Sequence, residues 1–85
     1  MVKSWIKQLK IINMNSKINF DKIILDILNM EFENYDIKNL NWYENLYRVR
    51  IGTYRIIFKK INSEIKILFL WKRWDVYKWL RNYKE

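Results

Sequence analysis

The 85-residue sequence contains no histidine, no cysteine and no proline, and it has a single glycine. Without cysteine, neither a disulfide nor a thiolate zinc site can stabilise the fold. Histidine is the commonest metal ligand and general base, so its absence leaves lysine, arginine, tyrosine, aspartate and glutamate for any catalysis. We therefore expect no metal and no cofactor. No apolar run reaches the about 18 residues that a membrane span needs, and the N-terminus lacks a signal-peptide core, so a cytoplasmic protein without a membrane partner is expected.

Positive charge and aromatic side chains are abundant. Lysine and arginine number 17 against 9 aspartates and glutamates, which gives a formal net charge of +8. Hydrophobic residues make up 51% and aromatic residues 18% of the chain, enough for a packed core. Because no repeat or linker divides it, residues 1–85 are expected to form a single domain. The excess of positive charge indicates an anionic partner such as a nucleic acid or an acidic protein.

The first half of the chain has the periodicity of two helices. Apolar residues recur at helical spacing from Val2 to Ile12, with lysines between them. The asparagine- and serine-rich stretch 13–19 favours a turn. Asn19 is the expected N-cap of a second helix, whose apolar stripe consists of Phe20, Ile23, Ile24, Ile27 and Leu28. We expect these helices to form an antiparallel pair that serves as a packing layer.

The second half has the alternation of β-strands. The runs "LYRVRI", "YRIIFKKI" and "EIKILFLW" are rich in β-branched and aromatic residues, and short turns at 52–53 and 62–63 separate them. Asp75 is the expected cap of a short C-terminal helix. The sequence therefore predicts an α+β fold, in which an N-terminal helical hairpin packs on a three-stranded antiparallel sheet and a short helix follows.

The expected register of the hairpins gathers arginines on one face. A turn at 52–53 places Arg50 opposite Arg55, and the next hairpin is expected to pair Phe58 with Ile67, Ile56 with Phe69, and Tyr54 with Trp71. One face then carries the apolar residues that the helices cover. The other carries Arg48, Arg50 and Arg55 beside Ile57, Leu68 and Leu70.

Adjacent arginines on a sheet repel each other. At about 5.5 Å and an effective dielectric of about 20, the repulsion is on the order of 3 kcal/mol before salt screening. The cluster is interpreted as an anion site, and the alternative is three arginines that splay into water.

The C-terminal segment extends the basic face. Arg73 precedes Tyr77 by four residues and Arg81 follows it by four, so Tyr77 and Arg81 would share a helix face. Arginine binds phosphate in a bidentate manner, and tyrosine stacks on bases or relays protons. Lys72, Trp74 and Arg81 are the expected RNA contacts around this segment.

The stretch "LYRVRIGTYRIIFKK…EIKILFLWKRWDVYKWL" resembles the RelE/ParE toxin superfamily, over about residues 36 to 80. The resemblance implies a type II toxin that is neutralised by an antitoxin. The "RWDVY" tail favours the RelE-like branch, whose members are mRNA interferases. They inhibit translation by cutting mRNA in the ribosomal A site, through attack of the 2′-hydroxyl on the adjacent phosphate and without metal.

The resemblance also implies the site residues. Carried onto this chain, they are Arg48, Arg50, Arg55, Arg73 and Tyr77. Arg55 and Arg73 are expected to hold the scissile phosphate and stabilise its transition state, and Tyr77 to stack on a nucleotide or take part in proton transfer. Arg48 and Arg50 stand where the best-known RelE-like enzymes carry lysines. Because arginine stays protonated, neither is expected to act as the general base.

The start of the chain departs from the family pattern. Members usually open with a β-strand, whereas this sequence begins almost directly in "VKSWIKQL", so the first strand is expected to be missing. A bare sheet edge promotes unwanted pairing, and an antitoxin segment is expected to cover it. An acidic antitoxin tail would lay apolar residues against Ile57, Leu68 and Leu70 while its carboxylates meet the arginines.

Two other functions are compatible with the sequence. A ParE-like protein would inhibit DNA gyrase without nuclease residues. A non-catalytic RNA-binding domain, or a degenerate toxin, would bind single strands through its arginines and through Trp42, Tyr43, Trp74 or Trp79. The alternative for these aromatic residues is a role in packing.

Overall fold

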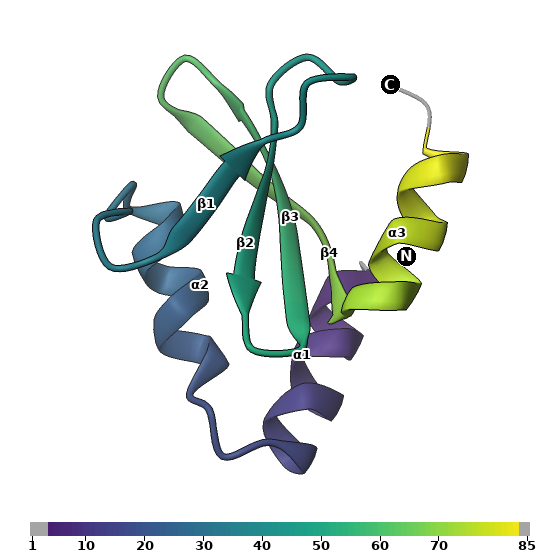
Figure 1. The fold of residues 1–85 in the computed structure, drawn as a ribbon. Helices are drawn as coiled ribbons and strands as arrows, with labels where there is room; N and C mark the ends of the chain where they lie inside the picture. Colours follow the sequence, from purple (N-terminus) through teal and green to yellow (C-terminus); the bar gives the residue numbers. More distant parts are fainter. Residues whose placement is uncertain (1–3, 84–85) are drawn as a thin grey trace.

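A computed structural model of the protein describes residues 4–83. Within this range the fold is α+β, as predicted, with three helices and a four-stranded antiparallel sheet (Figure 1). The elements are α1 (Ser4–Asn15), α2 (Phe20–Leu28), β1 (Asp36–Asn39), β2 (Leu46–Ile51), β3 (Tyr54–Ile61), β4 (Glu64–Lys72) and α3 (Arg73–Asn82). The strand order is β1-β2-β3-β4. No helix within residues 4–83 is long and apolar enough to cross a membrane.

The helical pair α1–α2 packs on one face of the sheet, as expected. The Asn19 side chain accepts a hydrogen bond from the Lys22 amide at 3.2 Å, which confirms the predicted N-cap. The expected stripe of α2 is buried except for Leu28, which is exposed beside the helix end. Helix α1 continues to Asn15, three residues into the predicted turn, where the Asn15 side-chain amide donates to the Ile11 carbonyl. Val2 lies outside the described residues.

The β2–β3 hairpin has the predicted register. Gly52 has a φ of 57°, which suits the turn, and Arg50 pairs with Arg55 while Arg48 pairs with Ile57. The arginines therefore share one face of the sheet, the face opposite the helical pair.

The register predicted for β3 and β4 is confirmed at the pair Phe58–Ile67 and is wrong from there to the end of β4. A bulge shifts it by one residue, so that Ile57 pairs with Phe69, Ile56 with Leu70 and Arg55 with Trp71. The bulge allows Ile67 and Leu70, which are three residues apart, to enter the same core under α1 and α2. Leu70 turns into the core under α1 and α2, and Phe69 turns to the other face, where it stacks on Trp79 at 4.9 Å.

The fourth strand, β1, was not predicted. It pairs with β2 so that Asp36 lies opposite Arg50 and Lys38 opposite Arg48. Its sequence, DIKN, is too short and polar to show alternation, and Ile37 is its one residue that packs against the core under the helices. The expected three-stranded sheet is corrected to four strands, and β1 covers the edge of β2. The expected absence of a strand before α1 concerns residues 1–3, which lie outside the described residues.

Helix α3 packs on the arginine-bearing face. It begins at Arg73, two residues before the predicted cap Asp75, and the Arg73 amide donates to the Thr53 carbonyl at 2.9 Å. This bond to the β2–β3 turn satisfies a free N–H at the helix start without a side-chain cap. Val76 and Leu80 are buried against Leu46 and Ile57.

The packing of α3 changes the apolar surface that was expected to receive an antitoxin. Ile57 is buried under α3, Leu70 is buried under the helical pair, and Leu68 is half-buried. An antitoxin therefore cannot contact Ile57 and Leu70 while the fold is intact.

Candidate nucleic-acid interface

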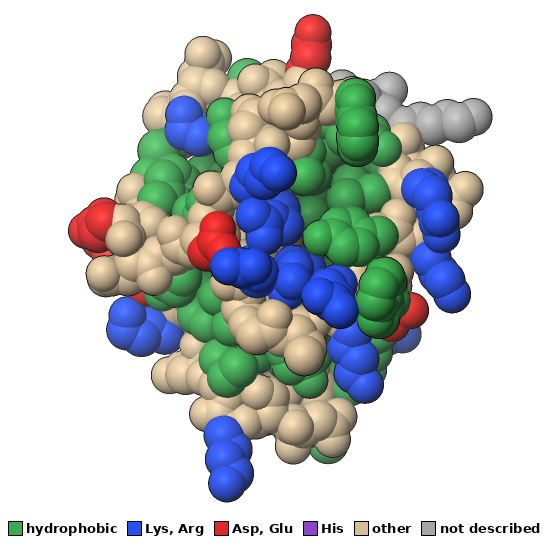
Figure 2. Space-filling model, viewed as in Figure 1, with side chains coloured by type: hydrophobic (Ala, Val, Ile, Leu, Met, Phe, Trp, Pro, Cys, Tyr) green, Lys and Arg blue, Asp and Glu red, His purple; other side chains and the backbone are tan. Residues whose placement is uncertain are grey.

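A band of basic side chains crosses the face of the sheet that carries α3. Figure 2 shows Lys and Arg side chains gathered over the middle of this face, with an acidic side chain touching the band. Three of its members come from neighbouring strands in register, because Lys38 lies opposite Arg48 and Arg50 follows two residues later. Among residues 4–83 no group of three or more carboxylates could hold a metal ion. Figure 2 shows lysine and arginine as the source of the positive charge on this face.

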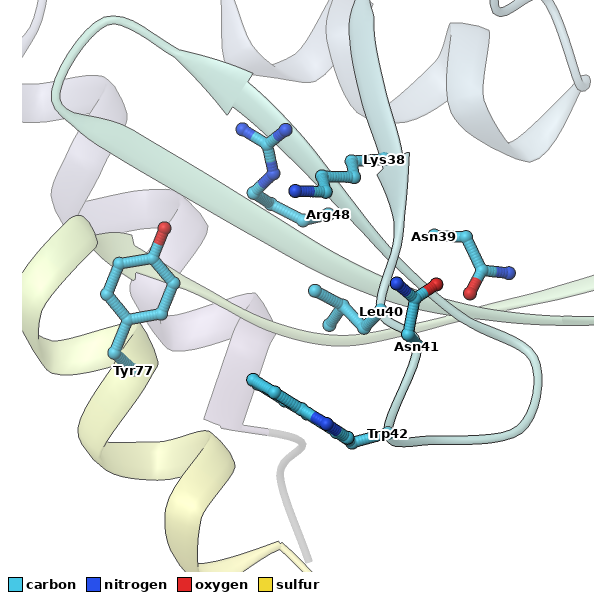
Figure 3. Close-up of a pocket in the computed structure, with 7 residues that line it drawn as sticks. All are labelled: Lys38, Asn39, Leu40, Asn41, Trp42, Arg48 and Tyr77. Atoms are coloured by element: carbon cyan, nitrogen blue, oxygen red, sulfur yellow. The ribbon is translucent and has the colours of Figure 1, made fainter.

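An open groove of about 420 Å³ lies beside this band, between the β1–β2 segment and α3. Its lining consists of Lys38, Asn39, Leu40, Asn41, Trp42, Arg48 and Tyr77. Figure 3 shows the Tyr77 hydroxyl pointing into the groove from α3, toward the side from which Lys38 and Arg48 enter. Leu40 lies between them, and the Trp42 ring lies on the opposite side. The groove thus combines two cations, two side-chain amides and two aromatic rings.

Arg48 and Arg50 are both paired with Asp36. The Arg50 Nη2 atom lies 2.6 Å from one oxygen of Asp36, and the Arg48 Nη2 atom lies 3.6 Å from the other. Arg48 is half-buried at the groove, whereas Arg50 is exposed. The carboxylate offsets part of the repulsion within the cluster. Asp36 was not foreseen as a site residue, because only the pairing of β1 with β2 brings it to the arginines.

Arg55 is buried, with 4% of its surface exposed. Its Nη1 atom donates to the carbonyls of Gly52 at 2.7 Å and Tyr54 at 2.8 Å, and its buried Nε has no partner. Arg50 and Arg55 are cross-strand neighbours as predicted, but their side chains have separate partners. Arg55 donates to carbonyls of the turn, and Arg50 contacts Asp36.

The remaining predicted residues lie around the start and the outer side of α3. The Arg73 guanidinium lies 4.6 Å from the centre of the Trp74 ring, and Trp74 is 68% exposed. Lys72 is exposed at the end of β4. Arg81 is exposed one turn after Tyr77 and does not line the groove.

The predicted catalytic residues are therefore not gathered at one point. Arg48 and Tyr77 line the groove, and Arg50 contacts Asp36 beside it. The Arg55 side chain and the backbone amide of Arg73 bond instead to carbonyls of the 52–53 turn. Lys38 was missed because β1 was missed. Trp42, considered only for stacking, lines the groove.

A hydrogen bond outside the groove holds the segment that leads into β1. The Tyr35 hydroxyl donates to Asp26 of α2 at 2.5 Å, and Lys22 contacts the same carboxylate at 3.0 Å. Burial and the bond to Asp26 raise the pKa of Tyr35 to about 12. The bonds from Tyr35 and Lys22 lower the pKa of Asp26. This contact fixes the chain directly before Asp36, and so helps to place the acidic partner of the two arginines.

Comparison with known proteins identifies the fold. No protein-family model and no curated protein sequence matches this chain significantly. The structure is similar to a chain in the crystal structure of the RelB–RelE antitoxin–toxin complex from Methanococcus jannaschii, with a TM-score of 0.67. The two chains are 24% identical, and the match covers 92% of this chain and 94% of the other. The fold is RelE-like. At this identity the likeness establishes the fold, and the function has to be argued from the site.

Proposed function

We propose that the protein is the toxin of a type II toxin–antitoxin system and that it cleaves mRNA in the ribosomal A site. The observation that carries the proposal is the groove in which Tyr77 faces Arg48 and Lys38 at the edge of a basic band. Its fold, shared with a chain of an antitoxin–toxin complex, supports an antitoxin as the partner. Such an antitoxin would offer acidic side chains to the same basic band. Because the proposed targets are an antitoxin and ribosome-bound mRNA, we propose that the protein acts in the cytoplasm.

The chemistry proposed for the groove is RNA cleavage by the neighbouring 2′-hydroxyl. The 2′-oxygen loses its proton and attacks phosphorus, the bond to the 5′-oxygen breaks, and that oxygen takes up a proton. The products are a 2′,3′-cyclic phosphate and a 5′-hydroxyl. Negative charge grows on the phosphate oxygens in the transition state, where fixed cations stabilise it most effectively.

Individual roles follow from position. Arg48 contacts the scissile phosphate, because it is half-buried in the groove and permanently charged. The Tyr77 hydroxyl takes part in proton transfer or its ring stacks on a nucleotide. Arg73 contacts the strand beside the 52–53 turn, and Lys72, Trp74 and Arg81 contact RNA farther along. Arg55 is assigned to holding the turn, since its Nη1 donates to backbone carbonyls and its side chain is buried.

The proposal is tested on ribosomes programmed with an mRNA and an open A site. Purified protein is added, and the 5′ ends of the mRNA are mapped by primer extension for the wild type, Arg48→Ala and Tyr77→Phe. We expect cuts at the A-site codon, reduced about 100-fold or more in Arg48→Ala, because removal of one transition-state donor has an effect of that size. Tyr77→Phe retains the ring and is expected to slow cleavage if the hydroxyl transfers a proton.

The matched control is Lys17→Ala, which removes an exposed charge in the α1–α2 turn, away from the groove. It should cleave like the wild type. Intact mRNA in the presence of folded wild-type protein would refute the proposal, and a DNA gyrase supercoiling assay would then test the ParE-like alternative. Equal cleavage by wild type and Arg48→Ala would refute the assignment of the groove.

A further inference from the structure

Building on the proposed function, we propose that the segment joining β1 to β2 forms a nucleobase-binding subsite. In this subsite the Trp42 ring stacks on an unpaired base of single-stranded RNA, while Lys38 and Arg48 hold the adjoining phosphate. The ligand class is a nucleotide within a single strand, read by its aromatic face.

Trp42 is more exposed than any other tryptophan among the described residues. It is 94% exposed, although it lines the groove. Trp79 stacks on Phe69 and Tyr83, Trp5 and Trp71 pack against the core, and the Arg73 guanidinium lies over one face of the Trp74 ring. No aromatic or cationic side chain within residues 4–83 stacks on Trp42. Both faces of its indole are therefore available to a ligand.

The segment that carries Trp42 is anchored on both sides. The Leu40 amide donates to the Leu46 carbonyl at 2.9 Å, and the Tyr43 hydroxyl donates to the Leu80 carbonyl of α3 at 2.6 Å. The side chains of Leu40 and Tyr43 pack in the cluster under α3. Trp42 is thus held outward by a braced turn, and a ring placed in advance loses less conformational freedom on binding.

The chemistry around the ring suits a nucleotide. Lys38 and Arg48 can hold a phosphate, the Asn41 amide offers a donor and an acceptor to a base edge, and no acidic side chain lines the groove. The groove volume of about 420 Å³ falls within the usual range for small-ligand sites. Charge alone would also attract an acidic peptide, but an uncovered indole beside the phosphate-binding cations favours a base, since every base has a π-face.

The test measures binding without cleavage. A fluorescent single-stranded RNA with 2′-O-methyl groups throughout cannot supply the attacking hydroxyl, and its affinity is measured by anisotropy at low salt. Trp42→Ala is expected to bind about 5- to 150-fold more weakly than wild type, the range that one stacked base contributes. Trp42→Phe retains an aromatic ring and should recover most of this loss. Met14→Ala, which removes an exposed apolar side chain from α1, is the control and should bind like wild type.

A second strand of the same length, with abasic sugars in place of bases, separates stacking from charge. Wild type and Trp42→Ala should bind it equally. Their affinities should also depend on salt with the same slope, since no charge is removed. Equal binding of the base-containing strand by wild type and Trp42→Ala would overturn the subsite. So would failure of wild type to prefer that strand over the abasic one. Because these strands cannot be cleaved, the result is independent of the A-site cleavage assay, and either proposal can fail alone.

Discussion

At the residue scale, the three arginines of the sheet differ in the groups that their side chains contact. Alternation along β2 and β3 was sufficient to predict that Arg50 and Arg55 are neighbours. It could not predict that Arg55 is buried, because its acceptors are backbone carbonyls, which have no signature in the sequence. Nor could it predict that Asp36 contacts these arginines, because the position of Asp36 depends on a strand of only four residues. Of the three arginines on the sheet, Arg48 and Arg50 are therefore the two available to an anion, and they share one carboxylate.

Replacement of Asp36 by asparagine is predicted to strengthen RNA binding. The variant removes the charge that faces Arg48 and Arg50, so both become freer to contact phosphates, and the slope of log affinity against log salt should steepen by up to about 1. Since the pair with Arg50 is exposed, the free energy of unfolding should fall by less than about 1 kcal/mol. Anisotropy titrations over a salt series and urea unfolding measure the two effects.

The matched variant for Asp36→Asn is Glu64→Gln, which changes the net charge equally at the β3–β4 turn. Because Glu64 faces no arginine of the band within the described residues, its effect on affinity should be much smaller. An equal gain in both variants would mean that Asp36 acts only through net charge.

At the element scale, long periodic segments were predictable and short or irregular ones were not. The stripe of α2 and the alternation of β2 and β3 identify those elements, since one buried face imposes a period. The bulge in β4 was not predictable from alternation, because it places Ile67 and Leu70, three residues apart, in the same core. Strand β1 has a single inward residue, Ile37, which is too little for a pattern. The groove depends on β1, so its lysine and its loop tryptophan could not be placed from the sequence.

Removal of the Tyr35 hydroxyl is predicted to alter the pH dependence of stability. The pKa of Tyr35 is raised to about 12 in the fold, above its ordinary value of about 10, so its bond to Asp26 stabilises the protein fully below about pH 10. That contribution is lost as the pH rises toward 12. Asp26 has a lowered pKa, so its contribution is present above about pH 4 and is lost as the pH falls through the folded value.

The measurement is urea unfolding of wild type and Tyr35→Phe at pH 7 and pH 11. Wild type should be the more stable at pH 7, and its advantage should shrink at pH 11. Tyr83→Phe removes a phenol near the end of α3 and serves as the control for general tyrosine ionisation. A constant difference between wild type and Tyr35→Phe across this range would show that the bond to Asp26 does not stabilise the fold.

At the scale of the whole molecule, the sheet separates the main hydrophobic core from the basic surface. One face packs on α1 and α2 and forms the larger core, and the other carries α3, the basic band and the groove. The net charge of +8 attracts anions over a distance, and in the proposed function the groove is the place where the RNA strand binds. This division was predictable in outline, because the arginines and the core residues alternate along the same strands. The extent of α3 over the second face was not, since its start is set by a bond to the 52–53 turn.

The most direct test of the proposed chemistry places one altered nucleotide in the ribosome-bound mRNA. The nucleotide on the 5′ side of the mapped cut is replaced by its 2′-deoxy form, with the rest of the message unchanged. If the 2′-hydroxyl is the nucleophile, cleavage at that position disappears, while the unmodified message yields a 2′,3′-cyclic phosphate and a 5′-hydroxyl. Continued cleavage of the 2′-deoxy message at the same position would contradict the mechanism and require another nucleophile at the groove.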